Sequence, residues 1–393
     1  MGMKQENPAK LNFQIFIPNS YIQMSDYQQH HMLHCISLAA KGRYQARPNP
    51  MVGAVIVRDD EVIAEGFHEK AGEAHAEINA LSQAGELAQG AELYITMEPC
   101  AHHGKTGPCT EAIINAGVAK VFYGMIDPDP KVAGKGVAAL QVAGIEVEGP
   151  ILEKQSRKLN AGFVKRHEQG LPYVKCKLAM SIDGRTAMAS GESKWITGRK
   201  SRDDVQALRA ASSAVVTGVD TILVDNPGLD SRLKNVEYEQ PLRVIVDSKL
   251  RTPLDAKTLS LPGKVLLATS IANNELLADK AAEFDEAKVM IRSFPGESGQ
   301  VDLKELLSFL ATEMECNDVL LESGASLAGA MLKQGLVDEV ITYIAPKILG
   351  SEARPLFQLP GLQKMSDHYN LEIIEVSMMG EDCKMRSRVT STD

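Results

Sequence analysis

The sequence predicts an α/β protein built from two domains. Segments typical of strands and helices alternate through both halves of the chain, and a Gly170-Leu171-Pro172 break follows a long helical connector. A chain of 393 residues is also long for one core, because domains usually hold ~100–200 residues. We therefore predict domains over residues 25–169 and 170–393, after an extension (1–24) whose role the sequence does not reveal.

The first half predicts one sheet covered by helices on both faces, because its strands and helices alternate. The predicted strands are 52–57, 91–98, 120–127 and 145–149. The predicted helices are 75–88, 108–118, 134–144 and the connector 152–170.

The second half predicts a mixed sheet. Its predicted strands are 173–181, 214–218, 242–248, 264–270, 318–324 and 337–346. The end of the chain, 371–389, has the pattern of two strands around a turn at Gly380. A terminal hairpin added to an α/β sheet predicts strands that are not all parallel.

Charge and cysteine usage exclude several classes of protein. The formal net charge of −9 opposes a broad phosphate-binding surface, so we expect no nucleic-acid partner. The six scattered cysteines predict a reducing compartment rather than a disulfide scaffold. No apolar run approaches the ~20 residues that span a bilayer, and no secretory signal is evident. We expect a cytoplasmic protein with no membrane partner.

Two short motifs predict a catalytic zinc site. His75-Ala76-Glu77 lies upstream of Met97–Cys109, which contains Pro99-Cys100 and a second cysteine. His-x-Glu followed by Pro-Cys and another cysteine is the signature of zinc-dependent base deaminases. One imidazole and two thiolates leave the fourth zinc position to water, and a nearby carboxylate moves protons to the ring and the departing amine.

The spacing of the cysteines leaves alternatives open. Eight residues separate Cys100 from Cys109, whereas the general signature is Cys-x-x-Cys. A structural four-ligand zinc site using His102 or His103 is therefore a competing hypothesis, although it leaves Glu77 without a role. A deaminase acting on nucleic acid, with an unrelated second domain, and a non-catalytic zinc scaffold are two further alternatives.

Longer motifs resemble one particular family. In the first half these are PNPMVGAVIV, HAEINAL, MEPCAHHGKTGPC and DPDPKVAGKG. In the second half they are KLAMSIDGRTAMASGESKWIT, GVDTILVDNPGLDSR, ESGASLAGAML and YIAPKILG. Over about residues 25–390 the chain resembles the bifunctional deaminase–reductases of riboflavin biosynthesis. In that family a long loop between the two cysteines is normal.

The resemblance implies a fold and two reactions. It implies an N-terminal cytidine-deaminase-like three-layer domain and a C-terminal dihydrofolate-reductase-like mixed-sheet domain. The first would hydrolyse the 2-amino group of 2,5-diamino-6-(5-phosphoribosylamino)pyrimidin-4-one. The second would use NADPH to reduce the ribosyl side chain, giving 5-amino-6-(5-phosphoribitylamino)uracil. The family also implies one zinc per chain and a homodimer.

The resemblance assigns residues to the deaminase site. Glu77 is the proton shuttle, and the zinc ligands are His75, Cys100 and Cys109. The expected substrate contacts are Asn49, His68, His102 and Lys105. Without the family, His68, His102 and Lys105 would be ordinary polar loop residues.

The reductase site rests more heavily on the resemblance, because neither G-x-G-x-x-G nor a Walker A motif is present. Lys177, which shares a strand face with Lys175, is expected to face the sugar carbon that accepts hydride; a merely polar strand face is the alternative. The expected substrate contacts are Ser193, Arg209, Leu229, Arg232 and Glu322. The two arginines suit a ribose phosphate.

The expected cofactor contacts follow a strand, a Gly-rich turn and a helix over 318–332, where helix-start N–H groups can receive a phosphate. They are Ala179, Trp195, Thr221, Asp225, Ser248, Gly324, Ala325, Ser326, Leu327, Ala328, Gly329 and Ala330. By itself, the single tryptophan, Trp195, would instead predict a core aromatic residue.

Overall fold

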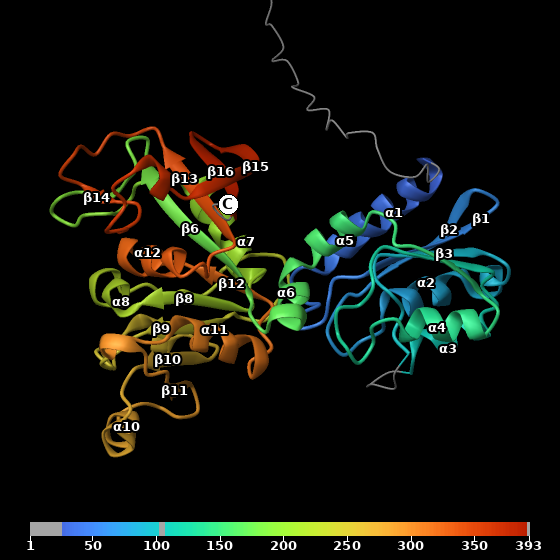
Figure 1. Cartoon of the computed structure of the whole chain (residues 1–393), viewed down its shortest axis with the longest axis horizontal. Coiled ribbons are helices and arrows are strands. Elements are labelled where there is room, and N and C mark those ends of the chain that lie inside the picture. The colour runs from blue at the N-terminus through green and yellow to red at the C-terminus, as the bar shows by residue number, and fades with distance from the viewer. Residues whose placement is uncertain (1–25, 102–106, 391–393) are drawn as a thin grey trace, which may run out of the picture.

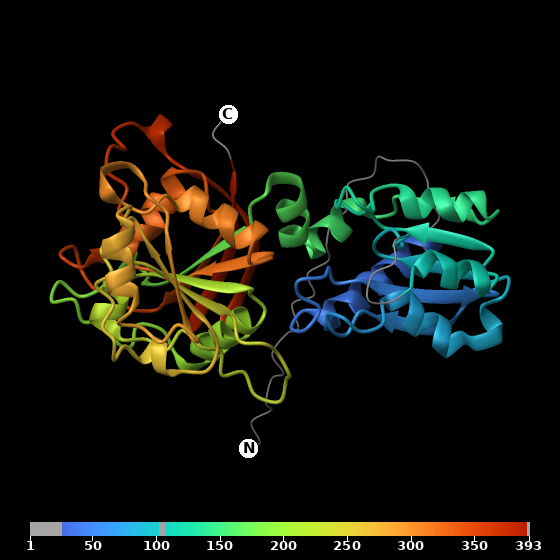
Figure 2. The ribbon, with the colours of Figure 1, turned by 90° about the horizontal axis from the view of Figure 1, so that it is seen from below.

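A computed structural model describes residues 26–101 and 107–390. Two sheets lie side by side, each with its own helices, and helices α5 (Glu153–Leu159) and α6 (Ala161–Gln169) lie where the two halves meet (Figures 1 and 2). The predicted single connector helix is thus two helices, because the backbone at Asn160 leaves the helical region. Among the described residues, no helix is both long and apolar enough to cross a bilayer.

The N-terminal sheet is mixed and has the strand order β2-β1-β3-β4-β5. Its strands are β1 (Gly53–Arg58), β2 (Glu61–Phe67), β3 (Glu92–Ile95), β4 (Lys120–Tyr123) and β5 (Glu146–Glu148). β1 runs antiparallel to β2 and β3, whereas β3, β4 and β5 are parallel. Strand β2 was not predicted: it carries two glutamates and a glycine, so it lacks the continuous apolar run that marks β1.

Helices cover both faces of this sheet, as predicted. One face packs on α2 (Ala76–Ala84), α3 (Cys109–Asn115) and α4 (Lys135–Val142) through Ala80, Ile113 and Leu140. The other face packs on α1 (Asp26–Ala39) through Met32, Cys35 and Leu38. The burial of these apolar side chains fixes the three layers.

The C-terminal sheet has the strand order β11-β10-β9-β8-β12-β6-β13-β16-β15. These strands are β6 (Tyr173–Ser181), β8 (Ala214–Gly218), β9 (Leu242–Val246), β10 (Val265–Thr269), β11 (Val289–Ser293), β12 (Asp318–Leu321), β13 (Glu339–Ala345), β15 (Asn370–Met379) and β16 (Asp382–Thr390). The strands from β11 to β13 are parallel, and the β15–β16 hairpin joins antiparallel to β13. The predicted mixed sheet and terminal hairpin are confirmed.

Helices and a small strand pair complete this half. The helices are α7 (Arg199–Ala210), α8 (Val219–Asp225), α9 (Lys257–Ser260), α10 (Asn274–Ala281), α11 (Leu303–Thr312) and α12 (Ala325–Lys333). β7 (Arg185–Ala187) pairs with β14 (Arg354–Pro355) outside the main sheet. The core lies between the sheet and α11 and α12, with Leu306, Leu310 and Met331 among its buried members.

Polar contacts tie the two halves together. Arg47, in the loop before β1, donates to the carbonyl oxygens of Ala210, Ser212 and Glu239. Lys165 Nζ lies 2.7 Å from each carboxylate oxygen of Asp338. Because these groups come from opposite halves, the loop before β1 and helix α6 take their positions partly from the second half.

Candidate active sites

The predicted zinc ligands converge at two helix starts. His75 is the residue that caps α2, and Cys109 begins α3 directly after Pro108. Cys100 lies in the loop after β3, and its sulfur accepts from the Cys109 backbone N–H at 3.5 Å. Gly66 on β2 lets the start of α2 approach closely, because a Cβ there would lie 2.3 Å from the Ala76 carbonyl oxygen.

The donor atoms fit zinc. The nitrogen and sulfur atoms of His75, Cys100 and Cys109 all lie within 4.8 Å of one another. His75 Nδ1 is 3.2 Å from Cys109 Sγ and 3.7 Å from Cys100 Sγ. Tetrahedral zinc with ordinary bond lengths separates such a nitrogen from a sulfur by about 3.6 Å. One imidazole and two thiols are also the donor set of a catalytic zinc that keeps a position for water.

Each thiol changes the ionisation of the other. Hydrogen bonding with Cys109 lowers the pKa of Cys100 to about 4, and the same contact, together with burial, raises the pKa of Cys109. Cys109 therefore holds its proton more strongly than Cys100 does. A cation that binds both thiolates must displace that proton.

Glu77 lies in the first turn of α2 beside the ligands, and its side chain is buried. Burial raises the pKa of Glu77 to about 7, although His75 opposes the shift. A carboxyl group with a pKa near neutrality can both accept and donate a proton at that pH. The position two residues after His75 is compatible with a shared site because the helix starts between them.

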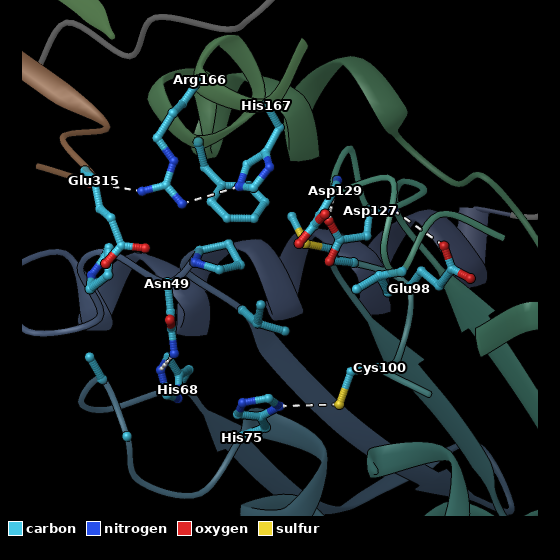
Figure 3. Close-up of a pocket in the computed structure, with 18 of the residues that line it drawn as sticks. Asn49, His68, His75, Glu98, Cys100, Asp127, Asp129, Arg166, His167 and Glu315 are labelled. Carbon is cyan, nitrogen blue, oxygen red and sulfur yellow. Dashed lines mark hydrogen bonds between the residues drawn. The ribbon is translucent and has the colours of Figure 1, made fainter. Parts of the chain in front are cut away.

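Two of the predicted substrate residues are joined to each other beside this cluster. Asn49 Nδ2 lies 3.1 Å from His68 Nε2, and His68 Nδ1 lies 3.1 Å from the Ala74 carbonyl oxygen. Both side chains line a cavity of about 560 Å³ together with His75, Glu77 and Cys100 (Figure 3). His102 and Lys105 lie outside the described residues.

Glu98, which was not predicted from the sequence, fixes the loop that carries Cys100 to the start of α4. Its carboxylate accepts backbone N–H bonds from Gly134, Gly136 and Val137 at 2.8–3.1 Å, at the start of α4. A Cβ on Gly136 would lie 1.9 Å from the Pro99 carbonyl oxygen. These contacts hold the loop that carries Cys100. The signal was present, since Glu98 belongs to the Met-Glu-Pro-Cys motif.

In the second half, Lys177, Arg209 and Glu322 form one charged group, in which Arg209 is buried and the other two are half-buried. Arg209 donates to the Glu322 carboxylate from Nε at 2.5 Å and from Nη2 at 3.0 Å. Lys177 Nζ lies 3.9 Å from Glu322. Burial opposes ionisation of Glu322, but Arg209 and Lys177 together hold its pKa below the ordinary value. Burial lowers the pKa of Lys177, and Glu322 opposes that shift.

The strand register explains this grouping. Lys175 and Lys177 alternate with buried residues along β6, as predicted. Lys175 pairs with Asp318 at 2.8 Å, and Lys177 faces Glu322. The guanidinium of Arg209 is occupied, because its third contact is the Asp230 carbonyl oxygen at 2.9 Å. Arg209 therefore holds Glu322 in place in this structure.

The remaining predicted substrate residues lie in different environments. Leu229 is buried in the core against α8, so its side chain packs rather than faces solvent. Arg232 is exposed and lies 3.4 Å from Asp230. Ser193 lies in the loop that follows β7.

Several predicted cofactor residues follow neighbouring parallel strands. Thr221 comes after β8, Ser248 after β9 and Gly324 after β12, and these strands are adjacent in the sheet. The carboxyl ends of parallel strands meet at one edge, where α/β proteins bind ligands. Gly324 precedes α12 without a side-chain cap, so the first N–H groups of that helix are not satisfied by a capping side chain. This arrangement fits a cofactor phosphate.

The cofactor segment is not uniformly accessible. Ala328 and Gly329 are buried, and a Cβ on Gly329 would lie 2.2 Å from the Gln358 carbonyl oxygen. Gly324 and Ser326 are exposed, whereas Ala325, Leu327 and Ala330 are half-buried. Only the first turn of α12 therefore offers backbone groups to a ligand.

Trp195 is exposed over 65% of its surface, so the interpretation as a core aromatic residue is wrong. Arg202 lies over its ring at 4.5 Å. Its neighbour Lys194 donates to the Asp225 carbonyl oxygen at 3.2 Å. Ala179, near the end of β6, is half-buried.

The two sites define a protein that joins a zinc-binding deaminase to a reductase. Residues 25–125 match the cytidine and deoxycytidylate deaminase zinc-binding region, and residues 172–385 match the RibD C-terminal domain. The chain belongs to the RibD family of riboflavin biosynthesis proteins. It is a bifunctional enzyme that carries out a deamination and a reduction in that pathway.

Whole-chain relatives support this membership. The chain is 43% identical to riboflavin biosynthesis protein RibD of Escherichia coli (strain K12) over 365 residues, covering 90% of this chain and 97% of the relative. The RibD of Haemophilus influenzae is 46% identical, with 90% and 95% covered.

Solved structures agree. Acinetobacter baumannii RibD, form 1, superposes with a TM-score of 0.84 at 46% identity, covering 93% of this chain and 99% of the other. A diaminohydroxyphosphoribosylaminopyrimidine deaminase/5-amino-6-(5-phosphoribosylamino)uracil reductase from Thermotoga maritima gives 0.81 at 33% identity, with 93% and 99% covered.

Proposed function

We propose that residues 25–169 deaminate 2,5-diamino-6-(5-phosphoribosylamino)pyrimidin-4-one at its 2-amino group, and that residues 170–393 reduce the ribosyl side chain of the product with NADPH. The grouping of His75, Cys100 and Cys109 with the buried Glu77 carries this proposal. The substrates named for the Thermotoga relative support it.

In the deaminase site, His75, Cys100 and Cys109 would hold one zinc per chain. When bound, zinc supplies the Lewis acidity that activates water near neutral pH. Glu77 would take one proton from that water and give it to the ring nitrogen, and would then pass the second proton, from the added hydroxyl group, to the amine as it leaves as ammonia. Asn49 and His68, joined at 3.1 Å, would orient the pyrimidine at the wall of the same cavity.

In the reductase site, NADPH supplies a hydride when bound, and the chain orients the reactants. We infer that the first turn of α12 receives a cofactor phosphate, with Thr221 and Ser248 at the same edge of the sheet. Lys177 would contact the sugar. Glu322 would hold Lys177 in position, and Arg209 in turn holds Glu322. We also expect a homodimer, which sedimentation can test.

Glu77→Gln tests the proposed chemistry. The substitution keeps the size of the side chain and all three ligands, so zinc should be retained while ammonia release falls by about 10²–10⁴-fold. Zinc is measured by elemental analysis, and the two products by mass spectrometry with and without NADPH. Unchanged deamination by Glu77→Gln would show that Glu77 is not the proton shuttle. Ammonia release from tRNA, with none from the pyrimidinone phosphate, would favour a nucleic-acid deaminase instead.

A further inference from the structure

The deaminase cavity extends beyond the ligand cluster to the junction of the two halves. His75, Glu77 and Cys100 line one end. Arg166 and His167, on α6, line the other end together with Glu315 from the second half. Figure 3 shows Arg166 and His167 projecting into the cavity opposite His75 and Cys100, with Asn49 between the two ends and His68 beside His75.

The guanidinium group of Arg166 is held in position by two hydrogen-bond contacts, but no carboxylate of the described residues forms an ion pair with it. Its Nη1 donates to the Glu315 carbonyl oxygen at 2.8 Å, and its Nη2 lies 3.2 Å from His167 Nε2. Within residues 26–101 and 107–390, no carboxylate lies within salt-bridge distance of this guanidinium. Arg209 differs, because Glu322 occupies its fork. A half-buried arginine without a counter-ion favours an anionic ligand.

The other charged groups of the cavity lie elsewhere or have partners. Asp127 and Asp129 lie on a different wall from Arg166 (Figure 3), and each accepts a backbone N–H bond, at 2.8 and 2.9 Å. Glu98 is occupied by the N–H groups at the start of α4. Glu73 and Glu315 are exposed, so solvent screens their charges. Burial lowers the pKa of Arg166, and the charges of Glu315 and Asp129 oppose that shift without forming an ion pair with it. The two aspartates suit sugar hydroxyls, which donate to carboxylates.

We propose that Arg166, with His167 beside it, binds the phosphate of the deaminase substrate. The proposal rests on the function proposed above, because it requires a phosphorylated pyrimidine. The ring would then lie at the His75 end, the sugar along the wall of Asp127 and Asp129, and the phosphate at the junction. The guanidinium fork matches phosphate oxygens, and the Glu315 carbonyl oxygen, from the reductase half, orients it.

The test is the steady-state deaminase kinetics of Arg166→Ala, with the phosphorylated substrate and with the same compound lacking its phosphate. The loss of a charge-assisted contact should raise the KM for the phosphorylated substrate by about tenfold or more. The value of kcat should change little, as should turnover of the dephosphorylated compound. Arg166→Lys should fall between, since it keeps the charge and loses the fork. Reductase activity of the same sample checks the fold.

Arg157→Ala is the matched control. Arg157 lies on α5 and pairs at the surface with Glu168 at 2.7 Å, so its removal should leave both KM values unchanged. An unchanged KM in Arg166→Ala would overturn the inference. An equal rise for both compounds would also overturn it, because the damage would then not concern the phosphate. Failure of the unsubstituted protein to deaminate the phosphorylated pyrimidine would instead overturn the proposed function.

Discussion

The side-chain amide of Asn317, in the reductase half, donates a 2.8 Å hydrogen bond to the carbonyl oxygen of Pro48, the residue before Asn49. Asn160 holds the other side of the same loop, through the backbone N–H and carbonyl of Met51, each at 2.8 Å. The loop that presents Asn49 is therefore fixed from the connector and from the second half.

Asn317→Ala should weaken deaminase substrate binding without affecting reduction. A neutral hydrogen bond contributes ~0.5–1.5 kcal/mol, so kcat/KM for deamination should fall by roughly two- to tenfold, mainly through KM. Glu237→Gln is the control: the Glu237 carboxylate makes an exposed ion pair across the halves with Lys70 at 3.4 Å, and its backbone carbonyl, which accepts from Gln45 in the loop at 3.0 Å, is unchanged by the substitution. Equal effects of both substitutions would show that Asn317 has no special role in the deaminase site.

Arg209→Met should destabilise the reductase half strongly. It leaves the carboxylate of Glu322, whose side chain is only 10% exposed, without its bidentate partner, and breaking a fully buried pair costs ~3–5 kcal/mol, which is the upper bound here. The double variant Arg209→Met with Glu322→Gln should recover part of that loss, because the uncompensated charge is gone. Thermal and urea unfolding of the two single variants and of the double variant measure the change in the free energy of unfolding. If the loss of unfolding free energy in the double variant equalled the sum of the losses in the two single variants, the two residues would not be coupled.

The alkaline limb of the reductase pH profile should depend on Lys177. Burial lowers the pKa of Lys177 below its usual 10.5, and Glu322 raises it. If the ammonium form binds the sugar, activity is present below this pKa and is lost as the pH rises through it. Glu322→Gln removes the supporting charge, so the limb should move to lower pH. Because the substrate is identical in both profiles, a limb at the same pH would exclude Lys177 as the titrating group.

His102→Ala and Lys105→Ala should each keep zinc and impair deamination. Among the described residues, the donor cluster is complete with His75, Cys100 and Cys109, and neither substitution removes one of its donors. Zinc content and ammonia release are measured on the same samples. Loss of zinc in His102→Ala would restore the four-ligand structural site as the better hypothesis.

The sequence predicted the buried strands for physical reasons, and it singled out three residues that the structure brings together; their role as zinc ligands stays a prediction. β1, β8 and β10 are short apolar runs, so burial alone marks them. His75, Cys100 and Cys109 are marked by residue types that few other roles require at such spacing.

Features that depend on contacts distant in sequence were not predictable in this way. Strand β2 contains both polar and apolar residues, so its own sequence does not mark it as a strand. It forms by pairing with β1. Arg166 resembles any surface arginine on a connector helix until the fold places Glu315 beside it. Likewise, the fork of Arg209 seemed suited to phosphate, and only the structure shows Glu322 occupying it.

The contacts of Arg47 have a consequence for protein engineering. A truncated deaminase ending at residue 169 would keep every proposed zinc ligand, yet the guanidinium of Arg47 would lose the carbonyl oxygens of Ala210, Ser212 and Glu239. Pro48 would lose Asn317, and Lys165 would lose Asp338. The sequence can be divided at Gly170, but these contacts show that each half helps to position residues of the other. A split-gene version should work only when both pieces are co-expressed and reassociate.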